Sequence, residues 1–167
     1  MRVAAGFPLL VRPTDAHGGR GLERIVDAAA LADYAARVPA AGYDVGTFVD
    51  YRSADGWYRK YRVMFVDGQP YPYHLAIDEN WMIHYHRAPM ERHAWMREEE
   101  RRFLSAPGEA LSCGPGVLRA VAAAIGLDYA GIDCTMLADG TLLVFEADAA
   151  MLVHDFDPQP AKRAAYG

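Results

Sequence analysis

The 167-residue sequence contains no long apolar run and few cysteines, and basic residues are not in excess. No apolar stretch approaches the 18 residues typical of a membrane-spanning helix. The first ten residues are broken by Pro8 and are too short for a signal-peptide core. The two cysteines, Cys113 and Cys134, lie far apart in apolar contexts, which favours structural thiols in a reduced, cytoplasmic protein.

The charge balance argues against a nucleic-acid partner. Lys and Arg number 17 against 22 Asp and Glu, giving a formal net charge of −5, whereas nucleic-acid binding requires surplus basic residues. The aromatic stretch 58–85 could stack bases, but this charge favours a sheet core instead. The 52% hydrophobic and 23% charged residues exclude a disordered chain, and the length allows one domain or two small lobes.

Hydrophobic periodicity predicts an α+β chain with a lobe boundary at the turn 53–56, giving lobes 1–52 and 53–167. Asp27 is expected to cap the first helix, and Gly126 to end the last. The tail from Asp155 is expected to be irregular. Strands are predicted at 7–12, 22–26, 43–51, 59–67, 71–77, 81–86, 129–137 and 141–147, and helices at 27–38, 90–104 and 117–125.

The last predicted hairpin brings acidic residues together. Asp139-Gly140 is typical of a two-residue type I′ turn, in which Ala138 would pair with Thr141. Counting back from this turn places Asp133 directly opposite Glu146. Asp148 shares the face of Glu146, because side chains alternate along a strand.

The negative charge of such a carboxylate cluster must be compensated. Opposed Cβ atoms lie about 4.5–5.5 Å apart, and like charges that face each other at this distance destabilise a sheet. A divalent cation would provide it, and carboxylate oxygens suit Mg²⁺ or Mn²⁺. Alternatively, one carboxyl group is protonated or a basic side chain pairs with the acids. A one-residue change of register would separate Asp133 from the other two.

A glycine-rich loop follows the first predicted strand, over 12–21. Its glycines would let backbone amides approach phosphate oxygens, and Arg12 and Arg20 would add positive charge. The spacing matches neither a P-loop nor a dinucleotide-binding fingerprint. A surface turn without a ligand is the commoner explanation of such a segment.

Four segments together resemble the ATP-grasp superfamily, in particular glutathione synthetase and the ribosomal-protein glutamate ligases, over about residues 7–153. Members of that family contain four segments in a fixed order. A strand with a basic residue before proline comes first and is followed by a mobile glycine loop, then by an adenine-binding hinge strand and finally by a metal-binding hairpin. The corresponding segments here are Leu9–Pro13, His17–Gly21, Gly46–Tyr51, and Gly131–Asp133 with Asp139-Gly140 and Phe145–Asp148.

The resemblance implies two small lobes, each with an antiparallel sheet and covering helices, that bind ATP and Mg²⁺ or Mn²⁺. Arg62 would be directed toward a phosphate or acyl group, although a surface cation is the alternative, and Arg12 would act beside it. Asp50 would contact ribose, or equally be a solvated strand end. The metal would be held by Asp133, Glu146 and Asp148, the phosphates by Arg12, His17, Gly18, Gly19, Arg20 and Gly21, and adenine by Thr47, Phe48 and Val49.

The implied reaction joins a small-molecule or peptide carboxylate to an amine or thiol through an acylphosphate. Three positions depart from the family pattern: Arg12 replaces Lys, Thr47 replaces Glu and Asp148 replaces Asn. We expect that the family's N-terminal domain is missing, so that a partner chain or a homodimer would supply it. The alternative is a non-catalytic module that binds nucleotide or a partner.

The histidines between residues 74 and 93 do not form a zinc motif, since their spacing is loose and no cysteine lies nearby. From the family resemblance, His86 and Arg87 are more plausible as substrate contacts.

Overall fold

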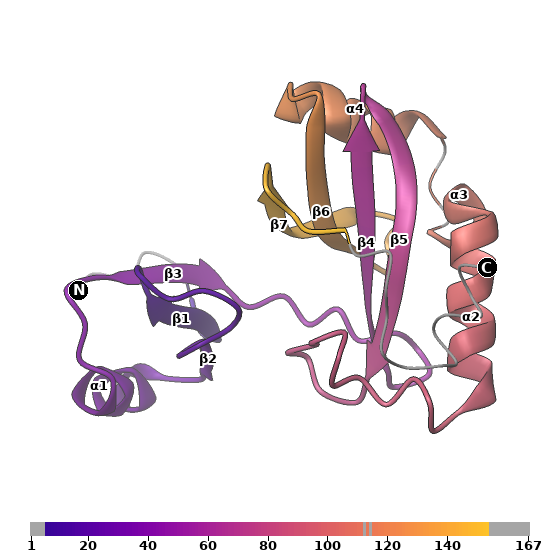
Figure 1. Cartoon of the computed structure of the whole chain (residues 1–167). Helices are drawn as coiled ribbons and strands as arrows, with labels where there is room; N and C mark the ends of the chain where they lie inside the picture. Colours follow the sequence, from indigo (N-terminus) through magenta and orange to yellow (C-terminus); the bar gives the residue numbers. More distant parts are fainter. Residues whose placement is uncertain (1–5, 112, 114, 154–167) are drawn as a thin grey trace. The chain divides into compact units, whose positions relative to one another are not determined.

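The computed structural model describes residues 6–111, 113 and 115–153, and the chain divides into two compact units. Unit 1 ends at Asp50 and unit 2 begins at Tyr51, two residues before the boundary expected at 52/53. Each unit has its own antiparallel sheet with helices against it (Figure 1). The α+β class expected from the sequence is therefore confirmed.

Unit 1 contains a three-stranded sheet in the order β2-β1-β3 and one helix. The helix begins where predicted, because the Asp27 carboxylate accepts a 2.8 Å hydrogen bond from the amide of Ala30. A core of Leu9, Val11, Ile25 and Tyr34 joins the helix to the sheet. The elements are β1 (Leu9–Pro13), β2 (Glu23–Ile25), α1 (Ala28–Arg37) and β3 (Tyr43–Thr47).

Unit 2 contains a four-stranded sheet in the order β5-β4-β6-β7. The Asp67-Gly68 hairpin joins β4 to β5 as predicted, with positive φ at both residues. The strands are β4 (Tyr58–Val66), β5 (Gln69–Asp78), β6 (Tyr129–Met136) and β7 (Leu142–Asp148), and the helices are α2 (Ala94–Ser105), α3 (Pro107–Ala110) and α4 (Pro115–Ile125).

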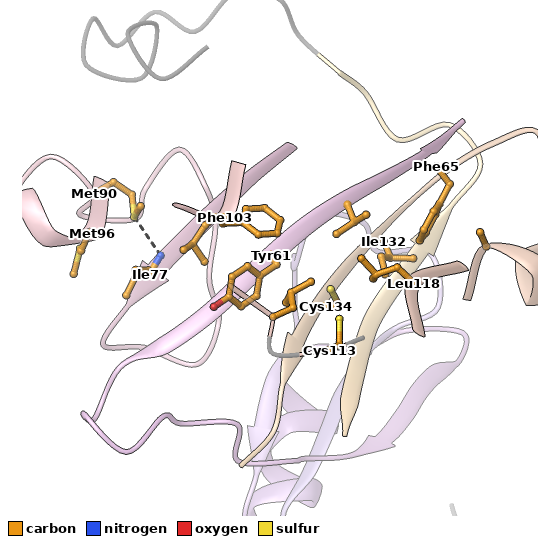
Figure 2. Close-up of a cluster of buried hydrophobic side chains, with 14 residues drawn as sticks. Tyr61, Phe65, Ile77, Met90, Met96, Phe103, Cys113, Leu118, Ile132 and Cys134 are labelled. Atoms are coloured by element: carbon orange, nitrogen blue, oxygen red, sulfur yellow. Dashed lines mark hydrogen bonds between the residues drawn. The ribbon is translucent and has the colours of Figure 1, made fainter. Parts of the chain in front are cut away.

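The two faces of the unit 2 sheet differ in character. Alternation along β4 directs Tyr61, Val63 and Phe65 into the main core. There they meet Phe103 of α2 and Leu118 of α4, among other apolar side chains (Figure 2). Lys60, Arg62 and Met64 lie on the opposite face of the same strand, as the alternation predicts. The second face therefore carries Lys60 and Arg62.

The strand predicted at 81–86 is wrong, because this segment forms turns instead. The Asp78 carboxylate accepts the amide of Asn80 at the end of β5, and the amides of Arg87 and Ala88 both donate to the carbonyl of His84. The alternation that predicted a strand comes from apolar and aromatic side chains packed onto the sheet: Ile83, Trp81 and Tyr85 join Tyr51, Tyr58 and Ala76.

The predicted strand 43–51 is shorter than expected, since β3 ends at Thr47. The predicted tail from Asp155 lies outside the described residues. Among the helices of the described chain, none has the length and apolar character needed to cross a bilayer.

Replacing the N-cap residue of α1 tests the account of unit 1. We expect Asp27→Ala to lower the free energy of unfolding by about 1 kcal/mol, because the amide of Ala30 loses its acceptor. Urea unfolding of the full chain measures the change. Asp15→Ala, an exposed carboxylate in the preceding loop, is the matched control and should change stability by less than about 0.5 kcal/mol. Equal losses in both variants would contradict the capping assignment.

Candidate functional site

A row of polar side chains crosses all four strands of the unit 2 sheet. The strand register places His74 of β5 opposite Arg62 of β4, and Arg62 opposite Asp133 of β6. Asp133 in turn lies opposite Glu146 of β7. Asp148 follows two residues later and therefore shares the face of Glu146. The expected pairing of Asp133 with Glu146 is present in the structure.

The hairpin reaches this pairing by a different route from the one predicted. Its turn is not the expected two-residue turn: the amide of Leu137 donates to the carbonyl of Thr141, which leaves three residues, Ala138 to Gly140, in the loop. Cys134 consequently pairs with Val144, one residue away from the predicted register. A β-bulge between Asp133 and Cys134 then absorbs one residue of β7 and restores the predicted pair.

Two basic side chains hold the Asp133 carboxylate. Arg62 donates from Nε to Oδ1 at 2.7 Å and from Nη2 to Oδ2 at 3.0 Å. Lys60 Nζ donates to Oδ2 at 2.9 Å. The Asp133 side chain is only 4% exposed, against 17% for Lys60 and 22% for Arg62. This is the alternative in which basic side chains compensate the acid.

These contacts shift the titration of both partners. Burial would by itself raise the pKa of Asp133, but the hydrogen bonds from Arg62 and the charges of Lys60 and Arg62 outweigh it, and the pKa lies below its usual range. Burial would likewise lower the pKa of Arg62. The bond to Asp133, with the charges of Asp133 and Glu146, raises it instead. The ion pair is therefore charged on both sides at neutral pH.

The three carboxylates have donor atoms of the right kind for Mg²⁺, since all are hard oxygens. Glu146 and Asp148 are exposed, and one Asp148 oxygen accepts the amide of Ala150 at 2.7 Å. Asp133 has about four acceptor positions, of which three are already used. Within the described residues no three acidic, His or Cys side chains are gathered closely enough to hold an ion. The carboxylates share a face without forming a closed cluster.

In unit 1 the glycine loop is a succession of tight turns. The amides of Arg20 and Leu22 donate to the carbonyls of His17 and Gly19, and Gly18 and Gly19 adopt positive φ. Positive φ turns successive amides to one side, which is the geometry of anion-binding loops. His17, Gly18 and Arg20 are exposed.

The C-terminal end of the loop is fixed to the sheet and the helix. Gly21 has φ +70°, and a Cβ there would lie 2.9 Å from Cδ of Pro13. Its carbonyl accepts a 2.6 Å hydrogen bond from the hydroxyl of Tyr34 in α1. Glycine is therefore required at this position by both backbone conformation and close packing.

Arg12 lies on β1 next to the loop. Its Nε contacts Oδ2 of Asp44 at 3.1 Å, because the two residues are directly paired across β1 and β3. Both side chains are about half exposed, so this surface pair contributes little to stability. Arg12 can exchange Asp44 for another anion at small cost.

The segment expected to bind adenine is partly engaged within unit 1. The amide of Phe48 donates to the carbonyl of Pro8 at 3.0 Å, so this donor is not available to a ligand. The guanidinium of Arg24 lies 4.4 Å from the centre of the Phe48 ring. Thr47 pairs with Leu9 at the end of β3, whereas Val49 and Asp50 are exposed beyond it. Of the predicted adenine contacts, the backbone amide of Phe48 is therefore already occupied within unit 1.

Sequence reasoning missed Lys60 as a site residue. Its position two residues before Arg62 on one strand face was the available signal, because alternation places both cations on the face of the acidic hairpin. Nothing in the sequence indicated that β4 and β6 would be neighbours.

No protein-family model and no curated protein matches the chain. Several solved structures, however, match the chain. An L-amino acid ligase from Bacillus licheniformis shares 19% identity with a TM-score of 0.49, covering 89% of this chain and 33% of the other. A RimK domain ATP-grasp protein from Sphaerobacter thermophilus shares 16% with a TM-score of 0.44, covering 88% and 45%. A biotin carboxylase from Campylobacter jejuni shares 11% with a TM-score of 0.42, covering 89% and 32%.

The Sphaerobacter structure is described as an ATP-grasp protein. The chain spans about a third of the length of the ligase and of the carboxylase. At these levels of identity the likeness concerns the course of the chain and not its ligands or activity.

The contribution of the buried ion pair to stability can be tested by removing the charge of Asp133. We expect Asp133→Asn to lower the free energy of unfolding by about 3 kcal/mol, because Lys60 and Arg62 would be left close together without a counter-charge. Urea unfolding at pH 7 measures this loss. Glu146→Gln, on the exposed strand opposite, is the control and should change stability by less than about 0.5 kcal/mol.

The same ion pair should make the free energy of unfolding depend on pH. The pKa of Asp133 is lower in the folded chain than its usual value. Its contribution to stability is therefore complete above about pH 4 and is lost as the pH falls through the folded value. The difference between the wild type and Asp133→Asn should shrink in acid below that pH. A difference that stays constant down to pH 2 would contradict the ion-pair assignment.

Proposed function

We propose that this chain is the ATP- and metal-binding portion of an ATP-grasp ligase that activates a carboxylate through an acylphosphate. The observation that carries the proposal is the cross-strand pair of Asp133 and Glu146, with Asp148 on the same face. Three acids on one face of a sheet are compatible with binding Mg²⁺ or Mn²⁺ between the protein and a triphosphate.

In this proposal Glu146 and Asp148 supply the exposed metal ligands, and Asp133 adds its remaining acceptor position. The metal would supply charge neutralisation to the phosphates. Arg62 stays oriented by Asp133 and directs its unused N–H groups toward a phosphate or acyl oxygen. The residues of the sheet thus position charge, which is the main task in phosphoryl transfer.

Unit 1 would hold the nucleotide itself. The amides of Gly18, Gly19 and Gly21, with Arg12, His17 and Arg20 beside them, would bind phosphate oxygens. The exposed end of β3, from Thr47 to Val49, would border adenine, and Asp50 would contact ribose. A small-molecule or peptide carboxylate would be the substrate, in the cytoplasm, with a second copy or a partner chain completing the acceptor side.

The second candidate is a module without turnover. Asp133 is already neutralised by Lys60 and Arg62, so the sheet is electrostatically satisfied without a metal. The amide of Phe48 is likewise already bonded. A chain with these features would bind a nucleotide or a partner protein and release no product.

Nucleotide titrations test the proposal. We expect ATP to raise the melting temperature of the full chain only when Mg²⁺ or Mn²⁺ is present. The double variant Glu146→Gln, Asp148→Asn should weaken metal-dependent ATP binding at least about tenfold in calorimetry, because both exposed ligands are lost. These positions are preferable to Asp133, whose replacement also removes the ion pair of the sheet.

Asp128→Asn, which removes an exposed acid just before β6, is the matched control and should bind as the wild type does. The absence of metal-dependent stabilisation by any nucleotide would refute the proposal. Phosphate release with mixed amino acids separates the two candidates, since steady turnover by this chain alone would exclude the module.

A further inference from the structure

Asp148, one of the proposed metal ligands, is the last residue of an edge strand. The sheet order β5-β4-β6-β7 places β7 at one side, where among the described strands it pairs only with β6 (Figure 1). The ends of edge strands open readily, because their backbone is bonded on one side only. The exposed carboxylate of Asp148 therefore needs support from outside the strand if it is to keep one orientation.

The first support is the turn that follows the strand. The amide of Ala150 donates to Oδ1 of Asp148 at 2.7 Å, which is the bond of an Asx turn. Within the described chain Oδ1 is thus engaged with the backbone, and Oδ2 is the oxygen left for a ligand. The orientation of the carboxylate therefore depends on the course of the backbone over 148–151.

A hydrogen bond from β6 anchors the far end of this turn. The hydroxyl of Tyr129 donates to the carbonyl of Met151 at 2.6 Å, across 22 residues of sequence. Tyr129 is the first residue of β6 and pairs with Val66 of β4, so its backbone belongs to the central strands of the sheet. Its side chain is 40% exposed, and water could satisfy the hydroxyl equally well. The bond thus serves the turn rather than a buried polar group.

The side chain of Met151 is the second anchor. It is buried and lies over Gly131 of β6, next to Met64 of β4. A Cβ at residue 131 would lie 2.5 Å from Sδ of Met151 and 2.8 Å from Sδ of Met64, so glycine is required to leave room for both. Gly131 is also the β6 partner of Asp148. Met151 therefore fills the place that a side chain opposite Asp148 would occupy.

We infer that Tyr129 and Met151 are positioning residues for the carboxylate of Asp148. They anchor the turn 148–151 to β6 and β4, and Gly131 provides the space for this anchor. The anchored turn keeps the carboxylate on the face that it shares with Glu146. The use of this orientation for binding a metal rests on the proposed function, whereas the anchoring itself requires no ligand.

Hydrogen exchange of the Ala150 amide, followed by NMR in the full chain without metal or nucleotide, tests the anchor. Tyr129→Phe removes the hydroxyl and keeps the ring. We expect this variant to exchange about fivefold faster, because one hydrogen bond no longer holds the turn closed. Tyr71→Phe, at an exposed tyrosine of β5, is the matched control and should exchange like the wild type.

Two substitutions of Met151 test the second anchor in the same measurement. Met151→Ala should also speed the exchange of the Ala150 amide, since it empties the place over Gly131. Met151→Leu should restore slow exchange, because leucine fills a similar volume. Thermal unfolding of each variant checks that the chain is folded when the exchange is measured.

Calorimetric titration with Mn²⁺ and ATP tests what the orientation serves. Tyr129→Phe should weaken metal-dependent binding about fivefold in the wild-type background. It should have no further effect in a chain that already carries Asp148→Asn, since the hydroxyl acts through this carboxylate. A general loss of structure would instead weaken binding equally in both backgrounds.

Exchange at the wild-type rate in both Tyr129→Phe and Met151→Ala would overturn the inference. An affinity of Tyr129→Phe for Mn²⁺ and ATP equal to that of the wild type would also overturn it, while leaving the proposed ligase intact. Faster exchange in these variants of a chain that binds no metal–nucleotide complex would support the anchor and reject the ligase.

Discussion

The carboxylate of Asp133 is the constraint on which the charged face of the unit 2 sheet depends. Its side chain is almost fully buried, and it accepts hydrogen bonds from both Lys60 and Arg62. Without it, two cations on one strand face would repel each other in a region with little water. With it, β4 and β6 are joined by charge as well as by backbone hydrogen bonds, and Arg62 is held in one orientation. The row then continues to Glu146 on the exposed edge strand.

The pairing of Asp133 with Glu146 depends on two irregularities that cancel. The three-residue turn at Asp139-Gly140 shifts the strands by one residue relative to a two-residue turn, and the bulge beside Cys134 shifts them back. A bulge bends its strand and changes the direction of neighbouring side chains. Here it lies directly beside the charged row, so the local backbone irregularity and the polar site occupy the same place. The side chains of Glu146 and Asp148 are left exposed there.

The two units present contrasting electrostatic situations. In unit 1 the basic side chain of Arg12 forms an exposed pair with Asp44, and Gly18 and Gly19 of the glycine loop have positive φ. In unit 2 the central acid, Asp133, is already paired with Lys60 and Arg62. A triphosphate would thus meet positive groups in either unit, whereas a metal ion would depend on the exposed acids of β7. This difference explains why the metal ligands and the anion donors are assigned to different residues.

Local signals in the sequence determined most of the elements. The helix cap at Asp27, the hairpin at Asp67-Gly68 and the alternation along β4 all depend on neighbouring residues, and all three are present in the structure. The sequence also indicated the Asp133–Glu146 pair, although by a turn geometry that the structure does not have. Only the tertiary structure decided what compensates Asp133, because Lys60 lies 73 residues away and reaches it through the pairing of β4 with β6. The tertiary structure also decided the conformation of segment 81–88, because its alternating apolar residues fit a strand equally well. No local pattern encodes its packing onto the sheet through Trp81, Ile83 and Tyr85.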